Sequence, residues 1–164
     1  MKREFFRKIK WSLLVCLLSL GTAYAQVDTT KVIVDDIQID LKEVTVDKEK
    51  EAVEVALYLI SYEKNPREFR LNTFASQVID DKGKGYMFST MQLDRVMVQA
   101  ETRQNYLDYL LKHNKPVELR INYTSLSEDA NPAYLKLVFQ ESSKEGKFLE
   151  VEIPLSEEEG QERE

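Results

Sequence analysis

Apolar and polar residues alternate along most of the chain after residue 36, with a period of two. Because successive side chains of a strand point to opposite faces, each alternating run predicts a strand with one buried face and one wet face. Turn-forming residues separate the runs, notably at 47–50, 64–66, 127–132 and 142–146. The apolar positions of the five clearest runs are Ile37, Ile39, Leu41, Val44 and Val46; Val53, Val55, Leu57 and Leu59; Val117, Leu119, Ile121 and Tyr123; Ala133, Leu135, Leu137 and Phe139; and Leu149, Val151, Ile153 and Leu155.

Strands of this kind are typical of antiparallel sheets that pack on one side only. Seven or eight of them, separated by turns, predict an all-β fold in which two antiparallel sheets form a sandwich. A closed barrel is the alternative architecture for the same pattern.

One segment departs from this alternation, between Thr102 and His113. Its apolar residues recur at the spacing of a helix face, and they are Tyr106, Leu107, Leu110 and Leu111. Thr102 is suited to cap the start of a helix, and Asn114 and Pro116 supply a stop signal. The sequence therefore predicts one short helix of about three turns, inserted between two strands and covering one end of the sandwich.

The first 25 residues have the three parts of a secretory signal peptide. A basic stretch (1–10) precedes an apolar stretch (11–20), and Ala23-Tyr24-Ala25 supplies the small residues that signal peptidase recognises. The apolar stretch is shorter than the roughly 20 residues that span a bilayer. Cys16 lies inside it and follows Val15, where lipoproteins carry a small residue. We expect cleavage after Ala25 and an unanchored protein, soluble in the periplasm or outside the cell.

Removal of this leader makes the chain strongly acidic. After residue 25 there remain 18 Lys and Arg, 28 Asp and Glu, a net charge of −10 and no cysteine. Without disulfides the stability must come from a hydrophobic core, which a single domain of this length is large enough to form. Binding to phosphate backbones needs clustered basic residues, so nucleic acid is not an expected partner.

The expected organisation has four parts: a signal peptide (1–25), an N-terminal linker (26–35), one β-sandwich domain (36–155) and an acidic disordered tail (156–164). The tail carries five glutamates and too few apolar residues to pack. Docking to a basic partner is the alternative role for the tail.

The stretch from Val78 to Phe88 concentrates charged residues and glycines, as ligand-binding loops do. A P-loop would lead into a helix, whereas the residues from Tyr86 onwards favour a strand. A calcium loop needs oxygen ligands at alternate positions, which lysines and glycines occupy here. We therefore expect a hairpin in which Gly83 or Gly85 adopts a positive φ.

Few residues suggest catalysis. His113 is the one histidine of the chain, and a lone histidine does not make a zinc site, so we expect it at the surface. Asp36 and Asp40 are spaced for one strand face and would suit general acid–base chemistry, although solvated strand residues explain them equally well. We expect no enzyme activity, no metal and no cofactor.

The strand expected from Ala52 to Tyr62 is apolar on both faces. Its second face carries Ala56, Tyr58, Ile60 and Tyr62, where alternation would place polar residues. Either the predicted helix or a loop covers this face, or the face is exposed and binds a partner or a second copy. Tyrosine is enriched at interfaces, so Tyr58, Ile60 and Tyr62 are the candidate partner-binding residues.

A short motif lies near the expected mature N-terminus. Asp28-Thr29-Thr30 resembles the three-residue Asp-Thr acceptor of general O-glycosylation on envelope proteins of the Bacteroidota. The resemblance implies Thr29 as a glycosylation site.

Three stretches resemble the immunoglobulin-like domains of unknown function found in secreted bacterial proteins and lipoproteins. They are V-E-V-A-L-Y-L (53–59), I-D-D-K-G-K-G-Y (79–86) and K-P-V-E-L-R-I (115–121). The resemblance covers about residues 35–155 and implies an immunoglobulin-like sandwich without established catalytic residues.

Together these patterns favour an exported, non-enzymatic binding or assembly module of the bacterial cell envelope. Its expected partner is an envelope protein or a second copy of the chain. The alternative is a carrier whose strands enclose a small ligand or a lipid, in a barrel or an open sandwich.

Overall fold

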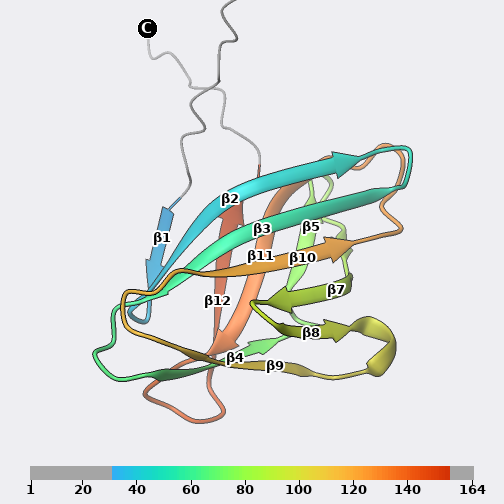
Figure 1. The fold of residues 1–164 in the computed structure, drawn as a ribbon. Helices are drawn as coiled ribbons and strands as arrows, with labels where there is room; N and C mark the ends of the chain where they lie inside the picture. Colours follow the sequence, from blue (N-terminus) through green and yellow to red (C-terminus); the bar gives the residue numbers. More distant parts are fainter. Residues whose placement is uncertain (1–30, 156–164) are drawn as a thin grey trace, which may run out of the picture.

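The computed structural model describes residues 31–155, which form two antiparallel sheets of six strands each (Figure 1). One 3-10 helix, η1 (Ala100–Thr102), is the single helical element in this range. The predicted all-β fold with two antiparallel sheets is confirmed. The expected signal peptide, Thr29 and the acidic tail lie outside the described residues.

Sheet A has the strand order β1-β2-β3-β10-β7-β8. Its strands are β1 (Lys31–Val34), β2 (Ile37–Asp47), β3 (Ala52–Ser61), β7 (Phe88–Leu93), β8 (Val96–Gln99) and β10 (Val117–Tyr123). Sheet B has the order β6-β5-β11-β4-β9, and β12 also pairs with β11. Its strands are β4 (Arg67–Asn72), β5 (Gln77–Asp80), β6 (Gly85–Tyr86), β9 (Tyr106–Leu111), β11 (Pro132–Gln140) and β12 (Phe148–Pro154).

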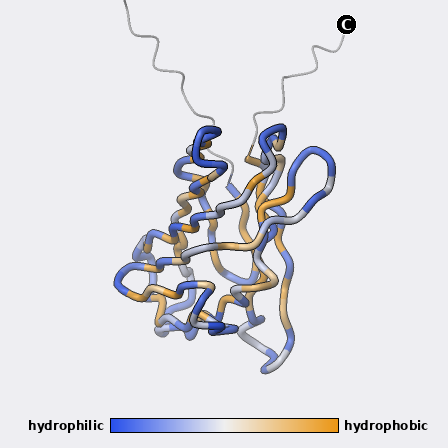
Figure 2. The backbone as a smooth tube through the Cα atoms, turned by 90° about the vertical axis from the view of Figure 1, so that its right-hand side faces the viewer, coloured by the Kyte–Doolittle hydropathy of each residue, from blue (hydrophilic) through white to orange (hydrophobic). Residues whose placement is uncertain are grey.

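The two sheets cross in space and enclose one core. In Figure 1 the strands β2, β3, β10, β7 and β8 of sheet A run across the front of the molecule, and β5, β11 and β12 run steeply behind them. The chain passes from sheet A to sheet B after β3, after β8 and after β10, and the second of these connections contains η1, where β8 and β9 are in contact. Sheets packed in this way bury the inward-facing row of each strand, and Figure 2 shows the hydrophobic residues along the strands and the hydrophilic ones at the turns.

The core contains the residues that the alternation predicts. The side chains of Leu57, Ile121 and Phe139 are fully buried, and the rings of Phe69 and Phe139 lie 5.2 Å apart between their centroids. The break in the pattern at residues 42–43 corresponds to a β-bulge, where the pairing of β2 with β3 shifts by one residue after Leu41.

The helix predicted between Thr102 and His113 is wrong, because most of that segment is β9. Leu107 and Leu111 of β9 are buried, whereas Tyr106 and Leu110 are 37% and 50% exposed on the opposite face. The four apolar residues that had the spacing of a helix face therefore lie on the two opposite faces of one strand. All six residues of β9 pair with β4, and this pairing outweighs the local pattern.

The expected number of seven or eight strands is too low, since the structure has twelve. β1 and β8 have four residues each, and β4 and β9 have six. Runs this short carry too little alternation to be recognised in the sequence. β1 also lies within the stretch expected as a linker, so the fold includes residues before position 36.

The charged stretch after Val78 forms the predicted hairpin between β5 and β6. Gly83 has a φ of +79° and supplies the positive φ of the turn. Asp80 stabilises the loop through three hydrogen bonds to its carboxylate. The donors are the N–H of Lys84 (2.8 Å), the N–H of Lys82 (3.0 Å) and the Tyr86 hydroxyl (3.0 Å). Burial raises the pKa of Asp80, but these hydrogen bonds outweigh burial and hold the pKa below its ordinary value.

The two buried tyrosines Tyr86 and Tyr123 differ in whether their hydroxyls are hydrogen-bonded. Removing the hydroxyl should therefore affect stability differently at the two positions. The Tyr123 hydroxyl has no hydrogen-bond partner among the described residues, and burial raises its pKa. We expect Tyr123→Phe to leave the free energy of unfolding unchanged or to raise it by about 1 kcal/mol, whereas Tyr86→Phe lowers it by about 1 kcal/mol. Urea unfolding of both variants measures this. An equal loss in the two variants would show that the Tyr123 hydroxyl has a partner in solution.

Candidate functional site

The apolar second face of β3 lies on the outer side of sheet A, away from the core. We name four apolar side chains on this side the tyrosine face; they are Tyr58 and Ile60 of β3, Tyr62 just after β3, and Ile33 of β1, which Gln38 and Asp40 of β2 separate from the other three. Ile33 is 59% exposed and Tyr62 42% exposed, while Tyr58 and Ile60 are half-buried. The expected helix does not exist, so no helix among the described residues covers this face.

Neighbouring polar side chains cover the tyrosine face in part and fix its rings. The Tyr62 hydroxyl donates to the side chain of Gln38, which in turn donates to Asp40 at 2.7 Å. The backbone N–H of Tyr62 donates to the carbonyl of Asp36 at 2.8 Å. The Lys42 ammonium lies 5.2 Å from the centroid of the Tyr58 ring, within reach of a cation–π contact. Two tyrosines held in place present contact area at little cost in conformational entropy.

A row of charges borders the tyrosine face on the same side of sheet A. Lys42 pairs with Glu118 at 2.6 Å, and Arg120 pairs with Glu118 and with Glu54. The hydrogen bond from Lys42, followed by that from Arg120, lowers the pKa of Glu118 below its ordinary value. The outer face of sheet A thus combines half-exposed apolar side chains with a charged border, the composition of a polar-rimmed interface.

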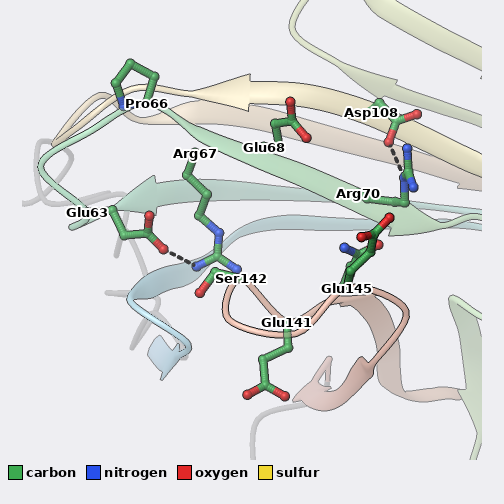
Figure 3. A pocket seen from close by; sticks show the side chains of 10 residues that line it. Glu63, Pro66, Arg67, Glu68, Arg70, Asp108, Glu141, Ser142 and Glu145 are labelled. Atoms are coloured by element: carbon green, nitrogen blue, oxygen red, sulfur yellow. Dashed lines mark hydrogen bonds and ion pairs between the residues drawn. The ribbon is translucent and has the colours of Figure 1, made fainter.

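The second feature is a cavity of about 510 Å³ between β4 and the loop that joins β11 to β12 (Figure 3). It opens because β4 and β11 share a single residue pair, Leu71 with Phe139, and are not paired beyond it. The lining is almost entirely charged or polar, and it consists of Glu63, Pro66, Arg67, Glu68, Arg70, Asp108, Gln140, Glu141, Ser142 and Glu145.

The cations of this cavity are already paired. Arg70 donates to Asp108 at 2.7 Å, and Arg67 donates to Glu63 at 3.3 Å. Figure 3 shows Arg67 extending from β4 toward the loop that carries Ser142. Glu68 and Glu145 have no ion-pair partner in the part of the chain that the structure describes, so the cavity has an excess of negative charge.

Arg67 also takes part in a hydrogen-bond network that connects three segments of the fold. Its side chain is only 2% exposed, and its guanidinium donates to the carbonyl and the carboxylate of Asp35 in the β1–β2 turn. The Asp35 carboxylate also accepts from the N–H of Ser142 at 2.8 Å and from its hydroxyl at 3.0 Å. Burial raises the pKa of Asp35, but the Ser142 N–H and the Arg67 guanidinium together lower it below its ordinary value.

The residues considered for catalysis lie apart. Asp36 lies in the β1–β2 turn with a φ of +57°, so it does not share a strand face with Asp40 as expected. His113 is exposed, and its Nδ1 lies 3.0 Å from the carbonyl oxygen of Glu63. Within residues 31–155 no group of histidine, cysteine and acidic residues is arranged to hold a metal ion.

Sequence reasoning missed Arg67 and the cavity. The alternation of Arg67, Phe69 and Leu71 places an arginine on the inward face of β4, and this was the available signal. The cavity depends on where β4 and β11 separate, a property of the tertiary structure that no local pattern encodes.

Comparisons with known proteins identify no relatives, since no protein-family model and no curated protein matches the chain. Within the described range, none of the helical residues forms a helix long and apolar enough to span a membrane.

The buried pair of Arg67 and Asp35 predicts a dependence of stability on this carboxylate. We expect Asp35→Asn to lower the free energy of unfolding by about 3 kcal/mol, because it leaves a buried guanidinium without its main counter-charge. Asp36→Asn is the matched control, since Asp36 is the next residue, is exposed and also has a positive φ. We expect that control to change stability by less than about 0.5 kcal/mol. Thermal and urea unfolding measure both variants. Equal losses of stability in Asp35→Asn and Asp36→Asn would contradict the role of the pair.

The same carboxylate predicts a dependence on pH. The folded-state pKa of Asp35 is lowered, so its contribution to stability is complete above its unfolded value of about 4 and is lost as the pH falls through the folded-state pKa. Urea unfolding from pH 7 to pH 3 should therefore show a smaller loss of stability for Asp35→Asn than for the unaltered protein. Parallel pH curves would contradict this assignment.

Proposed function

We propose that the protein is an exported, non-enzymatic binding or assembly module of the bacterial cell envelope. The observation that carries this proposal is the tyrosine face on the outer side of sheet A, where the apolar side chains of Ile33 and Tyr62 are 59% and 42% exposed. Apolar side chains gathered on an exposed sheet face are typical of surfaces that bind proteins. The leader pattern of residues 1–25 supports export.

The expected partner is a protein of the envelope. Tyrosine rings held by Gln38 and Lys42 suit a protein surface that offers apolar groups with polar neighbours. The ion pairs around Glu118 would form the rim of the contact, where charges favour orientation more than affinity. Membership among immunoglobulin-like domains and glycosylation of Thr29 stay predictions.

A carrier of a small ligand is the second candidate, and the 510 Å³ cavity is the observation that favours it. The charged lining does not suit a lipid chain, because burying apolar groups against charges leaves those charges without solvent. The carrier hypothesis is therefore restricted to a small polar or cationic ligand. Native mass spectrometry of the protein purified from its own host tests it, and an additional bound mass that disappears on unfolding would favour the carrier.

The tyrosine face is tested by removing its two rings. We expect the amount of partner recovered after crosslinking in intact cells to be at least about tenfold lower for the double variant Tyr58→Ser, Tyr62→Ser than for the unaltered protein. The reason is that tyrosines at interface centres contribute about 1.4 kcal/mol or more to binding. The tagged protein is purified and its crosslinked partners are identified by mass spectrometry.

The matched control is Tyr106→Ser with Tyr134→Ser, which removes two tyrosines from sheet B. Tyr106 is 37% exposed and Tyr134 is half-buried, similar to the pair on sheet A. Thermal unfolding checks that both double variants are folded. Equal recovery of partners with the two double variants would exclude the tyrosine face as the binding surface.

A further inference from the structure

β1 is an open edge of sheet A. It pairs with β2 along all four residues, and no other strand of the described chain pairs with its outer side. An open edge presents unpaired N–H and C=O groups that can pair with a strand from another chain. In Figure 1 β1 lies at one side of the molecule, next to β2.

The three residues that follow Lys31 in β1 do not protect this edge. Val32 and Val34 are half-buried against the core, and Ile33 is 59% exposed on the outer face, so the strand is apolar on both sides. β12 is also an edge strand, but it carries Glu150 and Glu152 and ends at Pro154, features that discourage pairing. The remaining edge of sheet A, β8, lies beside β9.

The segments of the chain that lie outside the structure are poorly suited to cover β1. After the expected cleavage only residues 26–30 precede it, fewer than a turn and a returning four-residue strand require. This step rests on the proposed export. Residues 156–164 contain no apolar side chain that could cover Val32 and Val34. Residues 26–30 and 156–164 therefore do not supply the occupant of this edge, and another molecule is the source that we consider.

The two ends of β1 carry complementary charges. Lys31 begins the strand and Asp36 lies in the turn after it, and neither has an ion-pair partner among residues 31–155. When two identical strands pair antiparallel, the start of each lies near the end of the other. Lys31 of each copy would then approach the Asp35–Asp36 turn of the other, twice in the same interface.

We propose that β1 is the interface for a second copy of this chain, with the two β1 strands paired antiparallel across a two-fold axis. In the register centred on Ile33, the two Ile33 side chains are opposite each other on the outer face. Val32 of each copy is opposite the second copy's Val34 on the inner face. The two copies of sheet A join into one sheet of twelve strands, and the valines are covered.

The proposed interface is small and self-complementary. A two-fold axis repeats each contact, as in most homodimers. A pairing limited to a four-residue strand and its neighbours falls at the low end of interface sizes, so the dimer should be weak and dependent on concentration.

Sedimentation equilibrium of the mature chain (26–164), from micromolar to about 1 mM, tests the proposal. We expect the average mass to rise from monomer to dimer across this range. Ile33→Lys should weaken dimerisation at least about tenfold, because it places two like charges directly opposite each other. Met97→Lys is the matched control, since Met97 is 53% exposed on β8 at the other edge of the same sheet.

A charge exchange tests the register. Lys31→Glu alone should weaken the dimer, and the double variant Lys31→Glu, Asp36→Lys should restore it, with thermal unfolding to confirm that each variant is folded. A monomeric protein at all concentrations, or equal dimerisation of Ile33→Lys and Met97→Lys, would overturn the proposal.

The outcomes also separate this inference from the proposed function. A monomer in solution that still crosslinks an envelope protein through the tyrosine face overturns the β1 dimer alone. If the purified protein forms a dimer that depends on Ile33, and crosslinking in cells finds no other partner, the results support the inference and limit the function to self-assembly.

Discussion

The buried ion pair of Arg67 and Asp35 is the contact on which the architecture of one end of the molecule depends. It joins β4 of sheet B to the β1–β2 turn of sheet A, and Ser142 of the β11–β12 loop binds the same carboxylate. The sequence contains a single cysteine, Cys16, so no disulfide between two of its own residues can serve this purpose. Arg67 also lines the polar cavity, and its hydrogen bonds to Asp35 hold the turn that follows β1.

The two faces of sheet A follow from different constraints. The inner face is determined by burial, and its side chains are the apolar residues of the period-two pattern. The outer face has no such requirement, yet it carries the apolar side chains of Tyr58, Ile60 and Tyr62, and that of Ile33 on the far side of β2. Packing within the described chain gives no reason for Ile33 to be apolar at 59% exposure, and this supports binding as the reason.

The features that depend on local alternation of apolar and polar residues could be predicted from the sequence. The features that depend on which strands and side chains pair with one another could not. Ile37, Leu57 and Phe139 were identified as core residues because their period is that of a strand. A tight hairpin needs a positive φ, for which the sequence offered Gly83 or Gly85, and the structure has it at Gly83. β9 was mistaken for a helix because Leu107 and Leu110 lie on opposite faces of a strand that is fixed by β4. The role of Arg67 depends on Asp35 and Ser142, which are far from it along the chain, and no local pattern relates them.

The most direct test of the binding surface is photo-crosslinking in intact cells, with a photoreactive amino acid in place of Tyr62. Gln92 of β7, on the same outer face but near the other edge of sheet A, is the control position. We expect a discrete crosslinked product from position 62, containing an envelope protein or a second copy of the chain, and none from position 92. No product from position 62, or the same products from both positions, would show that the tyrosine face is not the binding surface.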